Sequence, residues 1–395
     1  MLCRIPTTSD TTVVKAGWLL DGLGGPALQN AWFTVCRGKI SMVADNRPPG
    51  DYQTIDLSDY TVLPGLVDSH VHLFMSGSRD RNIHRSQINA CFDDAKEVIS
   101  DNIGQHLAHG TVAVRDGGDP MSHALRYKKE LMECHAPVFK IRAAGKGWYK
   151  RGRYGRIVGG DPLPDDDPVD TVIQWAKSVD HVKLINSGLN SINEFGRQTP
   201  PQFAPDELAY IVKETGSMGV KVMVHANGKK PVRDAVEAGA ASVEHGYFMG
   251  KDNLLRMADS GVFWVPTVVP MSAYADSSHD RKDVVLRTID HQLEQIAFAR
   301  QAGVTVAAGT DAGSPGVSHG DGMIREIELL MSAGFSIEQA IQCATSNGAR
   351  LAGLDGLGKL AAGAEAVWVA AKGGVSDLPA SLRSAVVYCC ARIDA

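Results

Sequence analysis

The sequence lacks the features that place a protein in a membrane or on a nucleic acid. Its 40 basic and 45 acidic residues give a formal net charge of −5 at pH 7, which provides no general attraction for nucleic acid or an anionic lipid surface. No segment approaches the roughly 20 uninterrupted apolar residues of a membrane helix, and the amino terminus has no apolar core typical of a signal peptide. We expect a soluble enzyme-sized chain with no membrane or nucleic-acid partner.

Cysteine is scarce, and its spacing argues against a cysteine-based metal site. The seven cysteines are scattered, odd in number and form no Cys-x-x-Cys pair. Such a pattern is typical of reduced thiols and predicts a cytoplasmic location. Any metal ligands must therefore come from other residue types.

Short apolar segments alternate with longer amphipathic stretches between residues 61 and 352, which is the pattern of βα units. Two helices are expected at 205–218 and 231–238, because each stretch opens with proline and is followed by glycine. The expected strands are Leu63–His72, Thr111–Arg115, Val138–Ala143, His181–Ile185, Lys221–His225, Ala241–His245, Val262–Thr267 and Val304–Gly309.

Eight such units predict an α/β fold with a (β/α)8 TIM barrel over residues 61–352, in which chemistry lies at the carboxyl ends of the strands. A doubly wound open sheet is the alternative, and the lack of a glycine-rich nucleotide fingerprint after the first strand weakens it. Both chain ends have hairpin patterns. We expect residues 1–60 and 353–395 to form one small β-sandwich domain.

Polar side chains of the metal-ligating kind fall at the ends of these strands. His70 and His72 alternate on the first strand and so face the same side, and neutral imidazole is the commonest metal ligand. The pair alone is weak evidence, but further candidates follow on other strands: Lys183, His225, His245 and Asp311. Their joint placement is hard to explain as packing.

The motifs around these residues resemble those of the amidohydrolase superfamily over nearly the whole chain. Leu63–His72 is similar to its first-strand motif, Gly110–Asp116 to its second strand, Gly309–Gly313 to its eighth, and Ala344–Leu351 to the helix that precedes the return to the β-domain. The surroundings of the lysine and of the two later histidines are most similar to the imidazolonepropionase-like branch, which includes Xaa-Pro dipeptidases. One departure is Ala362–Val367, where the superfamily usually has a Pro-Gly-x-x-Ala-Asp turn.

The resemblance implies two divalent metal ions. His70, His72 and Asp311 would hold the first, and His225 and His245 the second; these ligands suit zinc. The resemblance also implies that an N6-carboxylated Lys183 bridges both ions. An ammonium group has no lone pair, but burial lowers a lysine pKa and exposes an amine that can add carbon dioxide. A lysine paired with a carboxylate is the alternative.

The implied reaction is hydrolysis of a carbon–nitrogen bond, an amide in a dipeptide or N-acyl amino acid. A hydroxide between the ions would attack the carbonyl, with Asp311 as general base and then acid. Two alternatives stay open: a deaminase or cyclic-amide hydrolase acting on a heterocycle, and a metal-free, non-enzymatic scaffold.

Four further residues are expected to bind the small-molecule substrate. His319 and Tyr247 follow the eighth and sixth strands, and Tyr149 and Arg153 lie in the basic, aromatic segment 146–156 after the third. The cations of this segment could receive a carboxylate. The alternative is a solvated charge run.

Two expectations concern the structure rather than the chemistry. Nearby acidic residues at 165–167 could neutralise the basic segment, and Arg115 and Asp116 are expected to form a buried pair. We also expect a homo-oligomer, since closed homo-oligomers are common among soluble enzymes.

Overall fold

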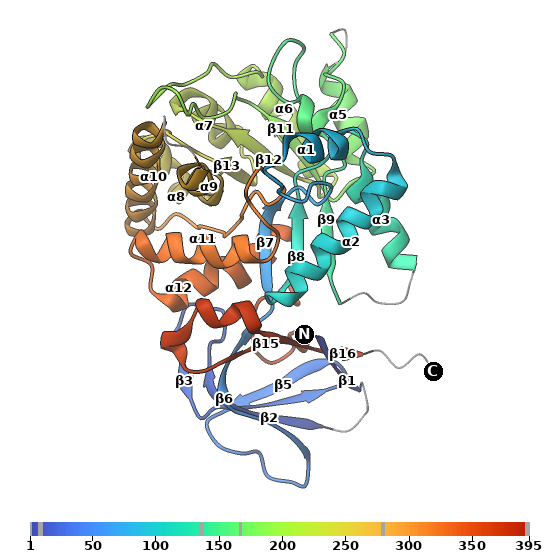
Figure 1. Cartoon of the computed structure of the whole chain (residues 1–395), viewed down its shortest axis with the longest axis vertical. Coiled ribbons are helices and arrows are strands. Elements are labelled where there is room, and N and C mark those ends of the chain that lie inside the picture. The colour runs from blue at the N-terminus through green and yellow to red at the C-terminus, as the bar shows by residue number, and fades with distance from the viewer. Residues whose placement is uncertain (1, 7–10, 134–137, 166–167, 278–280, 392–395) are drawn as a thin grey trace.

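The computed structural model describes residues 2–6, 11–133, 138–165, 168–277 and 281–391, and the chain has an α/β fold. Figure 1 shows a sheet at one end of the molecule and a larger body of strands surrounded by helices at the other. No described helix combines the length and apolar character that crossing a bilayer would require.

Strands from both chain ends form one eight-stranded sheet in the order β1-β16-β15-β6-β2-β4-β5, with β3 beside β2. The first strand runs parallel to the last, and β15 runs antiparallel to β6, so the two ends of the chain share this terminal sheet. That residues 1–60 and 353–395 form a β-sandwich of two packed sheets stays a prediction. The strands are β1 Leu2–Pro6, β2 Thr12–Leu19, β3 Leu28–Gln29, β4 Trp32–Cys36, β5 Lys39–Ala44, β6 Gln53–Pro64, β15 Val367–Lys372 and β16 Val386–Ala391.

The larger body contains two parallel sheets, β7-β8-β9 and β10-β11-β12-β13-β14. Seven of the eight expected strands are present, and a short one, β10, was not expected. Their bounds are β7 Leu66–Val71, β8 Thr111–Asp116, β9 Lys140–Ala143, β10 Gly147–Trp148, β11 His181–Ile185, β12 Lys221–Ala226, β13 Ser242–His245 and β14 Phe263–Val265.

The eighth expected strand, Val304–Gly309, is not a regular strand. It forms a single parallel bridge at Val306 to Trp264, and Ser69 N donates to Ala308 O at 2.9 Å. The segment thus lies between β14 and β7. Gly309 permits this close passage, because a Cβ there would lie 2.5 Å from Val265 Cγ1.

The expected single strand Leu63–His72 is divided between the two parts of the molecule. Its first residues end β6, where Leu63 pairs with Val369 of the terminal sheet, and β7 begins afresh at Leu66 beside β8. Both parts of this apolar run are buried, so hydrophobicity alone does not reveal where the chain passes from one sheet to the other.

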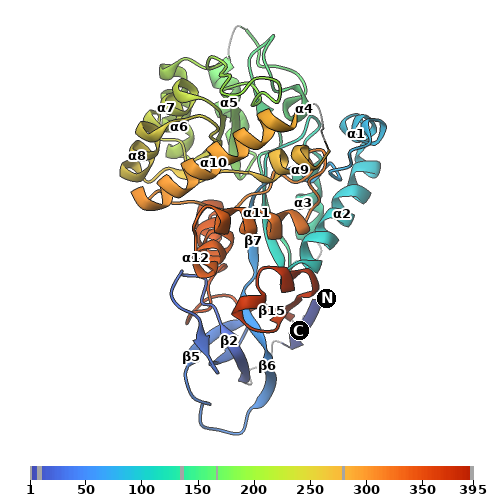
Figure 2. The same ribbon diagram turned by 60° about the vertical axis from the view of Figure 1, so that its left-hand side comes forward.

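Helices cover the parallel sheets on their outer side, as the two views in Figure 1 and Figure 2 agree. The helix expected at 231–238 begins two residues earlier, at Lys229, so Pro231 is its third residue; the first turn tolerates proline because its N–H groups have no partner inside the helix. The α-helices are α1 Arg81–Ile88, α2 Phe92–Ala108, α3 His123–Glu133, α4 Arg156–Gly159, α5 Pro168–Ala176, α6 Pro205–Ser217, α7 Lys229–Glu237, α8 Lys251–Ser260, α9 Val269–Ser277, α10 Lys282–Ala302, α11 Asp321–Ser332, α12 Ile337–Gln342 and α13 Gly348–Ala352.

A π-helical turn, Cys343–Asn347, joins α12 to α13, and two 3-10 turns, Val375–Asp377 and Ala380–Ser384, precede β16. The segment Ala344–Leu351 is therefore helical, as the resemblance implies. It packs on β7: a Cβ at Gly348 would lie 3.0 Å from Val67 O and from Ser69 Oγ. This contact braces the strand that carries the first two candidate ligands.

Candidate metal centre and active site

The carboxyl ends of the parallel strands surround a cavity of about 320 Å³. All six candidate metal ligands line this inner cavity although they come from five separate segments of the chain: His70, His72, Lys183, His225, His245 and Asp311. The tertiary structure therefore brings together the residues that the strand ends predicted.

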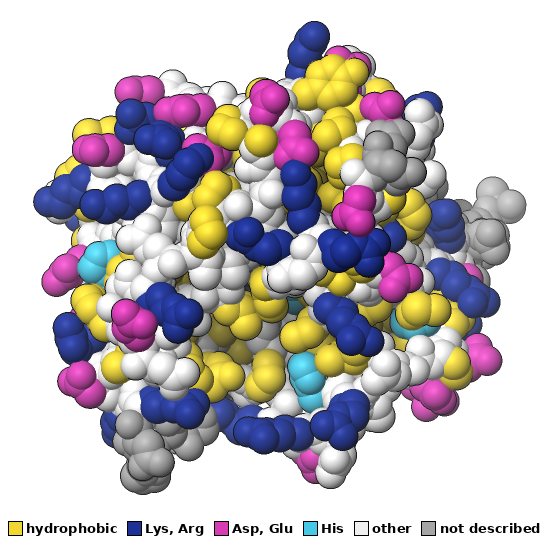
Figure 3. Space-filling model, turned by 90° about the horizontal axis from the view of Figure 1, so that it is seen from above, with side chains coloured by type: hydrophobic (Ala, Val, Ile, Leu, Met, Phe, Trp, Pro, Cys, Tyr) yellow, Lys and Arg dark blue, Asp and Glu magenta, His cyan; other side chains and the backbone are white. Residues whose placement is uncertain are grey.

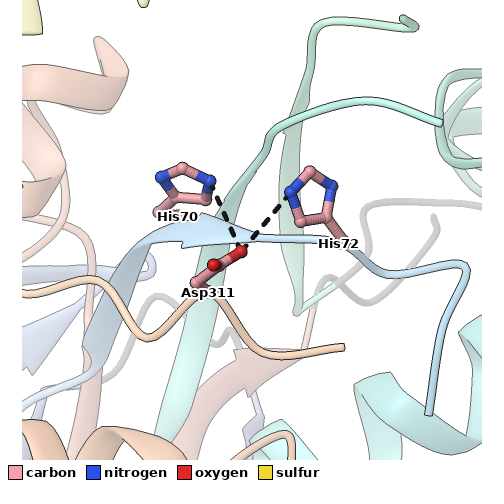
Figure 4. A group of neighbouring side chains, drawn as sticks. All are labelled: His70, His72 and Asp311. Atoms are coloured by element: carbon pink, nitrogen blue, oxygen red, sulfur yellow. Dashed lines mark ion pairs between the residues drawn. The ribbon is translucent and has the colours of Figure 1, made fainter. Parts of the chain in front are cut away.

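His70, His72 and Asp311 form the tightest group (Figure 4). Asp311 Oδ1 lies 3.7 Å from His70 Nε2 and 3.5 Å from His72 Nε2. These separations are long for hydrogen bonds. They match ligand atoms around one ion, because donors about 2.0–2.1 Å from a tetrahedral zinc lie roughly 3.3 Å from one another.

The hydrogen bonds of the two rings leave their Nε2 atoms free to act as ligands. His70 Nδ1 lies 2.7 Å from Glu244 Oε2, and His72 Nδ1 lies 2.9 Å from Gly118 O. Both partners are acceptors, so each Nδ1 carries the proton and each Nε2 a lone pair. Burial lowers the pKa of His72 to about 3 and that of His70 well below its ordinary value, which keeps both rings neutral.

His225 and His245 form a second pair of rings, with centroids 4.5 Å apart. His225 Nε2 donates to Gly188 O at 3.1 Å, so its lone pair is on Nδ1. His245 Nδ1 lies 2.6 Å from Thr267 Oγ1. Burial lowers the pKa of both rings, that of His225 to about 3.

Lys183 lies next to the first group, with Nζ 3.5 Å from His70 Nε2. The side chain is buried, and burial lowers its pKa to about 8 against the opposing effect of the carboxylates of Glu244 and Asp311. Within the described part of the chain Lys183 has no carboxylate oxygen within 4.0 Å, so the alternative of a lysine–carboxylate pair is not observed there. With a pKa of about 8, roughly a tenth of the Lys183 side chains are neutral amines at pH 7, and the neutral amine is the form that adds carbon dioxide.

Glu244 connects the ligands to a buried polar network. Its Oε1 accepts from Arg115 Nη1 at 3.3 Å and from Ser242 Oγ, and Arg115 Nη2 donates to Ser242 Oγ at 2.7 Å. The expected Arg115–Asp116 pair is wrong, because adjacent residues of a strand point to opposite faces. Asp116 instead accepts from the backbone N–H groups of Leu73 and Gly118, both at 2.8 Å.

Three residues at strand ends have left-handed backbone conformations, with φ of 69° at His245, 46° at Thr267 and 54° at Asp311. Such conformations cost about 1–3 kcal/mol each in residues other than glycine and cluster at functional sites. Hydrogen bonds hold them in place: Asp311 N donates to His70 O at 2.7 Å, and Gln292 Nε2 donates to His245 O at 2.6 Å.

The Asp311 carboxyl group has a pKa raised to about 7 by burial, partly offset by the positive charge of Lys183. A group with this pKa exchanges protons readily near neutral pH. Its position beside both histidines allows it to act as a metal ligand, as a proton acceptor, or as both.

Of the four residues expected to bind substrate, only Tyr247 lines the inner cavity; its hydroxyl donates to Thr267 O at 3.3 Å. His319 is buried outside the lining, with Nδ1 3.0 Å from His106 Nε2 and Nε2 2.8 Å from Met75 O. Both of its ring nitrogens are thus occupied within the protein.

The basic segment 146–156 directs its cations away from the inner cavity. Arg151 pairs with Asp165 at 3.0 Å, as expected of the acidic stretch 165–167, whose residues 166 and 167 lie outside the described residues. Lys150 pairs with Glu207, outside that stretch, at 2.6 Å. Arg153 Nη2 donates to Pro200 O at 2.7 Å, and the Tyr149 hydroxyl donates to Gly160 O at 2.6 Å. Neither lines the inner cavity.

Sequence reasoning missed Tyr154 and Asn227, which both line the inner cavity. The Tyr154 ring centroid lies 5.6 Å from that of His225, and burial raises the pKa of its hydroxyl. Tyr154 belongs to the aromatic segment that the sequence singled out, but a loop has no periodicity to show which of its aromatic residues faces inward. Asn227, two residues after His225, could have been found from its position just past a strand end.

Comparison with known proteins identifies the family to which the chain belongs. The model of the amidohydrolase family matches residues 61–388. The chain belongs to the amidohydrolase family. The family match and the relatives described next show that this amidohydrolase is a hydrolytic enzyme that acts on carbon–nitrogen bonds.

Relatives of this amidohydrolase lie in the imidazolonepropionase and Xaa-Pro dipeptidase branch. It is 24% identical over 375 residues to ochratoxinase of Aspergillus niger, covering 85% of this chain and 75% of that protein. It is 26% identical over 296 residues to imidazolonepropionase of Geobacillus thermodenitrificans, covering 68% of this chain and 64% of that protein. The crystal structure of a Xaa-Pro dipeptidase with bound methionine superposes with a TM-score of 0.81 at 25% identity, covering 95% of this chain and 97% of that one.

The Glu244 network generates a prediction about metal affinity. In Glu244→Gln, His70 keeps an acceptor for Nδ1, but the buried Arg115 loses its ion-pair partner. We expect the zinc affinity, measured by competition with a chelator, to fall about 10–100-fold, as is common when a partner of a ligating histidine is removed.

Glu237→Gln is the matched control, because this carboxylate on α7 has a side chain that is 55% exposed; zinc affinity should not change. A Glu244→Gln protein that binds zinc as tightly as the wild type would show that the network does not support the ligands.

Proposed function

We propose that this amidohydrolase is a binuclear metal-dependent amide hydrolase whose substrate is a dipeptide or an N-acyl amino acid. The observation that carries the proposal is the convergence of six ligand-type side chains on one cavity, four of them buried and those of His245 and Asp311 partly buried. Their other hydrogen bonds leave the Nε2 lone pairs of His70 and His72 free. Packing alone gives no reason to bury so many ionisable groups together.

The donor set fits two divalent ions. His70, His72 and Asp311 would hold one, His225 and His245 the other, and a carboxylated Lys183 would bridge them; nitrogen and oxygen ligands of this kind suit zinc. Ions held there would supply Lewis-acid polarisation of the scissile carbonyl and would make water more acidic.

The protein's own residues would move the proton. Asp311, with a pKa raised to about 7, would accept a proton from the attacking water and deliver it to the leaving nitrogen, as a group poised near the working pH can. Tyr154, Asn227 and Tyr247 line the same cavity and would orient the substrate by hydrogen bonds.

The cavity supports a compact, largely apolar substrate. Hydrophobic side chains face the candidate ligands across it, among them Ile157, Ile185, Leu189, Ile192 and Met271. The likeness to an ochratoxinase and to a Xaa-Pro dipeptidase also supports cleavage of an amide bond, while the likeness to an imidazolonepropionase keeps ring-opening of a cyclic amide as the second candidate.

The proposal includes the architecture. The bridge of Val306 to Trp264 and that of Ala312 to Val71 support one closed (β/α)8 barrel over residues 61–352, in which segment 304–309 takes the place of the eighth strand. Residues 1–60 and 353–395 would then be the second domain, and the protein would assemble as a homo-oligomer.

The test is a screen of zinc-loaded enzyme with dipeptides and N-acyl amino acids beside heterocyclic amides, together with metal analysis. We expect turnover of the open-chain amides and about two zinc ions per chain. Turnover of heterocycles alone with one ion would support the alternative, and a protein that binds no metal and hydrolyses nothing would refute both.

The role of Asp311 generates a second prediction. Because only the ionised carboxylate accepts a proton, wild-type turnover should decline as the pH falls through the pKa of this carboxyl group. Burial raises that pKa to about 7 in the metal-free protein, and a bound cation lowers it. Asp311→Asn should lower turnover at pH 8 by about 10²–10⁴-fold, the usual contribution of general acid–base catalysis.

Metal analysis accompanies this measurement, so that a lost ion is distinguished from a lost base. Asp321→Asn on α11, whose side chain is 45% exposed, is the control and should have wild-type turnover. An Asp311→Asn enzyme with both near wild-type turnover and intact metal content would contradict the assigned role.

Carboxylation of Lys183 generates a third prediction. The neutral amine adds carbon dioxide and releases one proton, so carbamate formation needs the unprotonated form. Because the pKa of Lys183 is about 8, zinc uptake by metal-stripped enzyme at a constant concentration of dissolved carbon dioxide should speed up as the pH rises through 8 and then level off.

Labelling with 13C-bicarbonate reports the carbamate directly by NMR. The signal should be present in the wild type and in Lys213→Gln, whose side chain is 78% exposed, and absent in Lys183→Gln. A signal that survives in Lys183→Gln would assign the carbamate elsewhere.

A further inference from the structure

A second, larger cavity of about 980 Å³ lies beside the inner cavity. The two cavities share four lining residues and therefore adjoin each other there: His84, Ile157, Tyr274 and Pro315. Figure 3, which looks onto the end of the molecule opposite the terminal sheet, shows Lys and Arg side chains around a hollow lined with hydrophobic side chains. We call the larger cavity the vestibule.

Arginine dominates the charge of the vestibule. Arg79 reaches it from the segment before α1, Arg81 and Arg85 from α1 itself, and Arg156 from α4. Asp161 is the one carboxylate in the lining, among the residues that the structure describes. Four guanidinium groups against one carboxylate make this region cationic, although the whole chain has a net charge of −5.

These guanidinium groups are not used to hold the described structure together. None of the four has a carboxylate oxygen within 4.0 Å in the described ranges, and all four residues are exposed. Arg79 alone makes a hydrogen bond, from Nη2 to Ala273 O at 2.9 Å. By contrast Arg151, in the segment that precedes α4, is paired with Asp165.

The inner cavity has the opposite character. Its described lining contains no arginine, and Lys183, beside the candidate ligands, is its one lysine. Beyond the ligand cluster its walls are mainly hydrophobic or aromatic. An anionic group of a substrate is therefore better stabilised in the vestibule than along the inner walls, since guanidinium groups bind carboxylates through paired hydrogen bonds.

We propose that the vestibule binds a carboxylate at the end of the substrate remote from the scissile bond, while the neutral, apolar part of the substrate fills the inner cavity. This inference rests on the proposed function and narrows its substrate class to amides with a distal carboxylate. Arg81, Arg85 and Arg156 are then specificity-determining residues, and Arg79 is held partly by its bond to the backbone.

The experiment measures binding to zinc-loaded full-length enzyme by titration calorimetry. The probes are the linear dicarboxylates glutarate, adipate and suberate and the monoamide of each. One carboxylate can occupy the metal centre while the other reaches the vestibule, so the result does not depend on which side of an amide faces outward.

In the wild type, at least one dicarboxylate should bind about 10-fold or more tightly than its monoamide, an advantage that several exposed charge pairs together can supply. The variant with Arg81→Gln, Arg85→Gln and Arg156→Gln should lose this preference and bind the monoamide as the wild type does. Added salt should weaken the preference. Arg151→Gln, the matched control, should leave it unchanged.

Equal binding of dicarboxylate and monoamide by the wild type, absence of any dicarboxylate binding, or a preference that survives in the triple variant would each overturn the inference. Unchanged thermal unfolding of the triple variant excludes misfolding. Because binding of these probes is measured without any need for amide cleavage, a failed substrate screen with an intact preference would refute the proposed reaction, and the reverse result would refute the vestibule.

Discussion

Burial of ionisable side chains at the ends of the parallel strands is the constraint on which the rest of the structure depends. A charge in such a place is costly unless it is neutralised or paired. The rings of His70 and His72 are neutral, with lowered pKa values, and the pKa values of Asp311 and Lys183 lie at about 7 and about 8. The Glu244–Arg115 pair balances charge within the same region. Burial thus leaves the two histidine rings neutral, with lone pairs that can bind a metal ion, and shifts the pKa values of Asp311 and Lys183 toward neutral pH.

The backbone positions these side chains through left-handed conformations, which cost conformational free energy. His245, Thr267 and Asp311 adopt left-handed conformations where three successive segments of the parallel array end. Three hydrogen bonds hold these positions: Asp311 N donates to His70 O, Gln292 Nε2 donates to His245 O, and the His245 ring bonds to the Thr267 hydroxyl. The terminal sheet contributes as well, because β6 ends at Pro64 and β7 begins two residues later. The strand with the first ligand pair is therefore anchored in a second sheet.

The two cavities differ in the charge of their linings. The inner cavity combines the ligand cluster with apolar walls, whereas the arginines of the vestibule lie on the far side of His84, Ile157, Tyr274 and Pro315. Strand ends supply the inner groups, and α1, α4 and the connecting loops supply the outer ones. Such a division is common in enzymes in which a rigid scaffold positions the reacting groups and the loops vary the substrate.

The sequence alone determined the class of the fold, the pairing of the two chain ends and the six candidate ligands, because these depend on local patterns: apolar strands, alternation along a strand and polar residues at strand ends. It did not determine which loop residues face the cavity. Tyr154 faces inward while Tyr149 and Arg153 bond to backbone carbonyls, His319 is enclosed by His106 and Met75, and Arg115 pairs with Glu244 rather than with its neighbour. Only the tertiary structure decided these contacts, because they join residues distant in the chain and loops have no periodicity that records their partners.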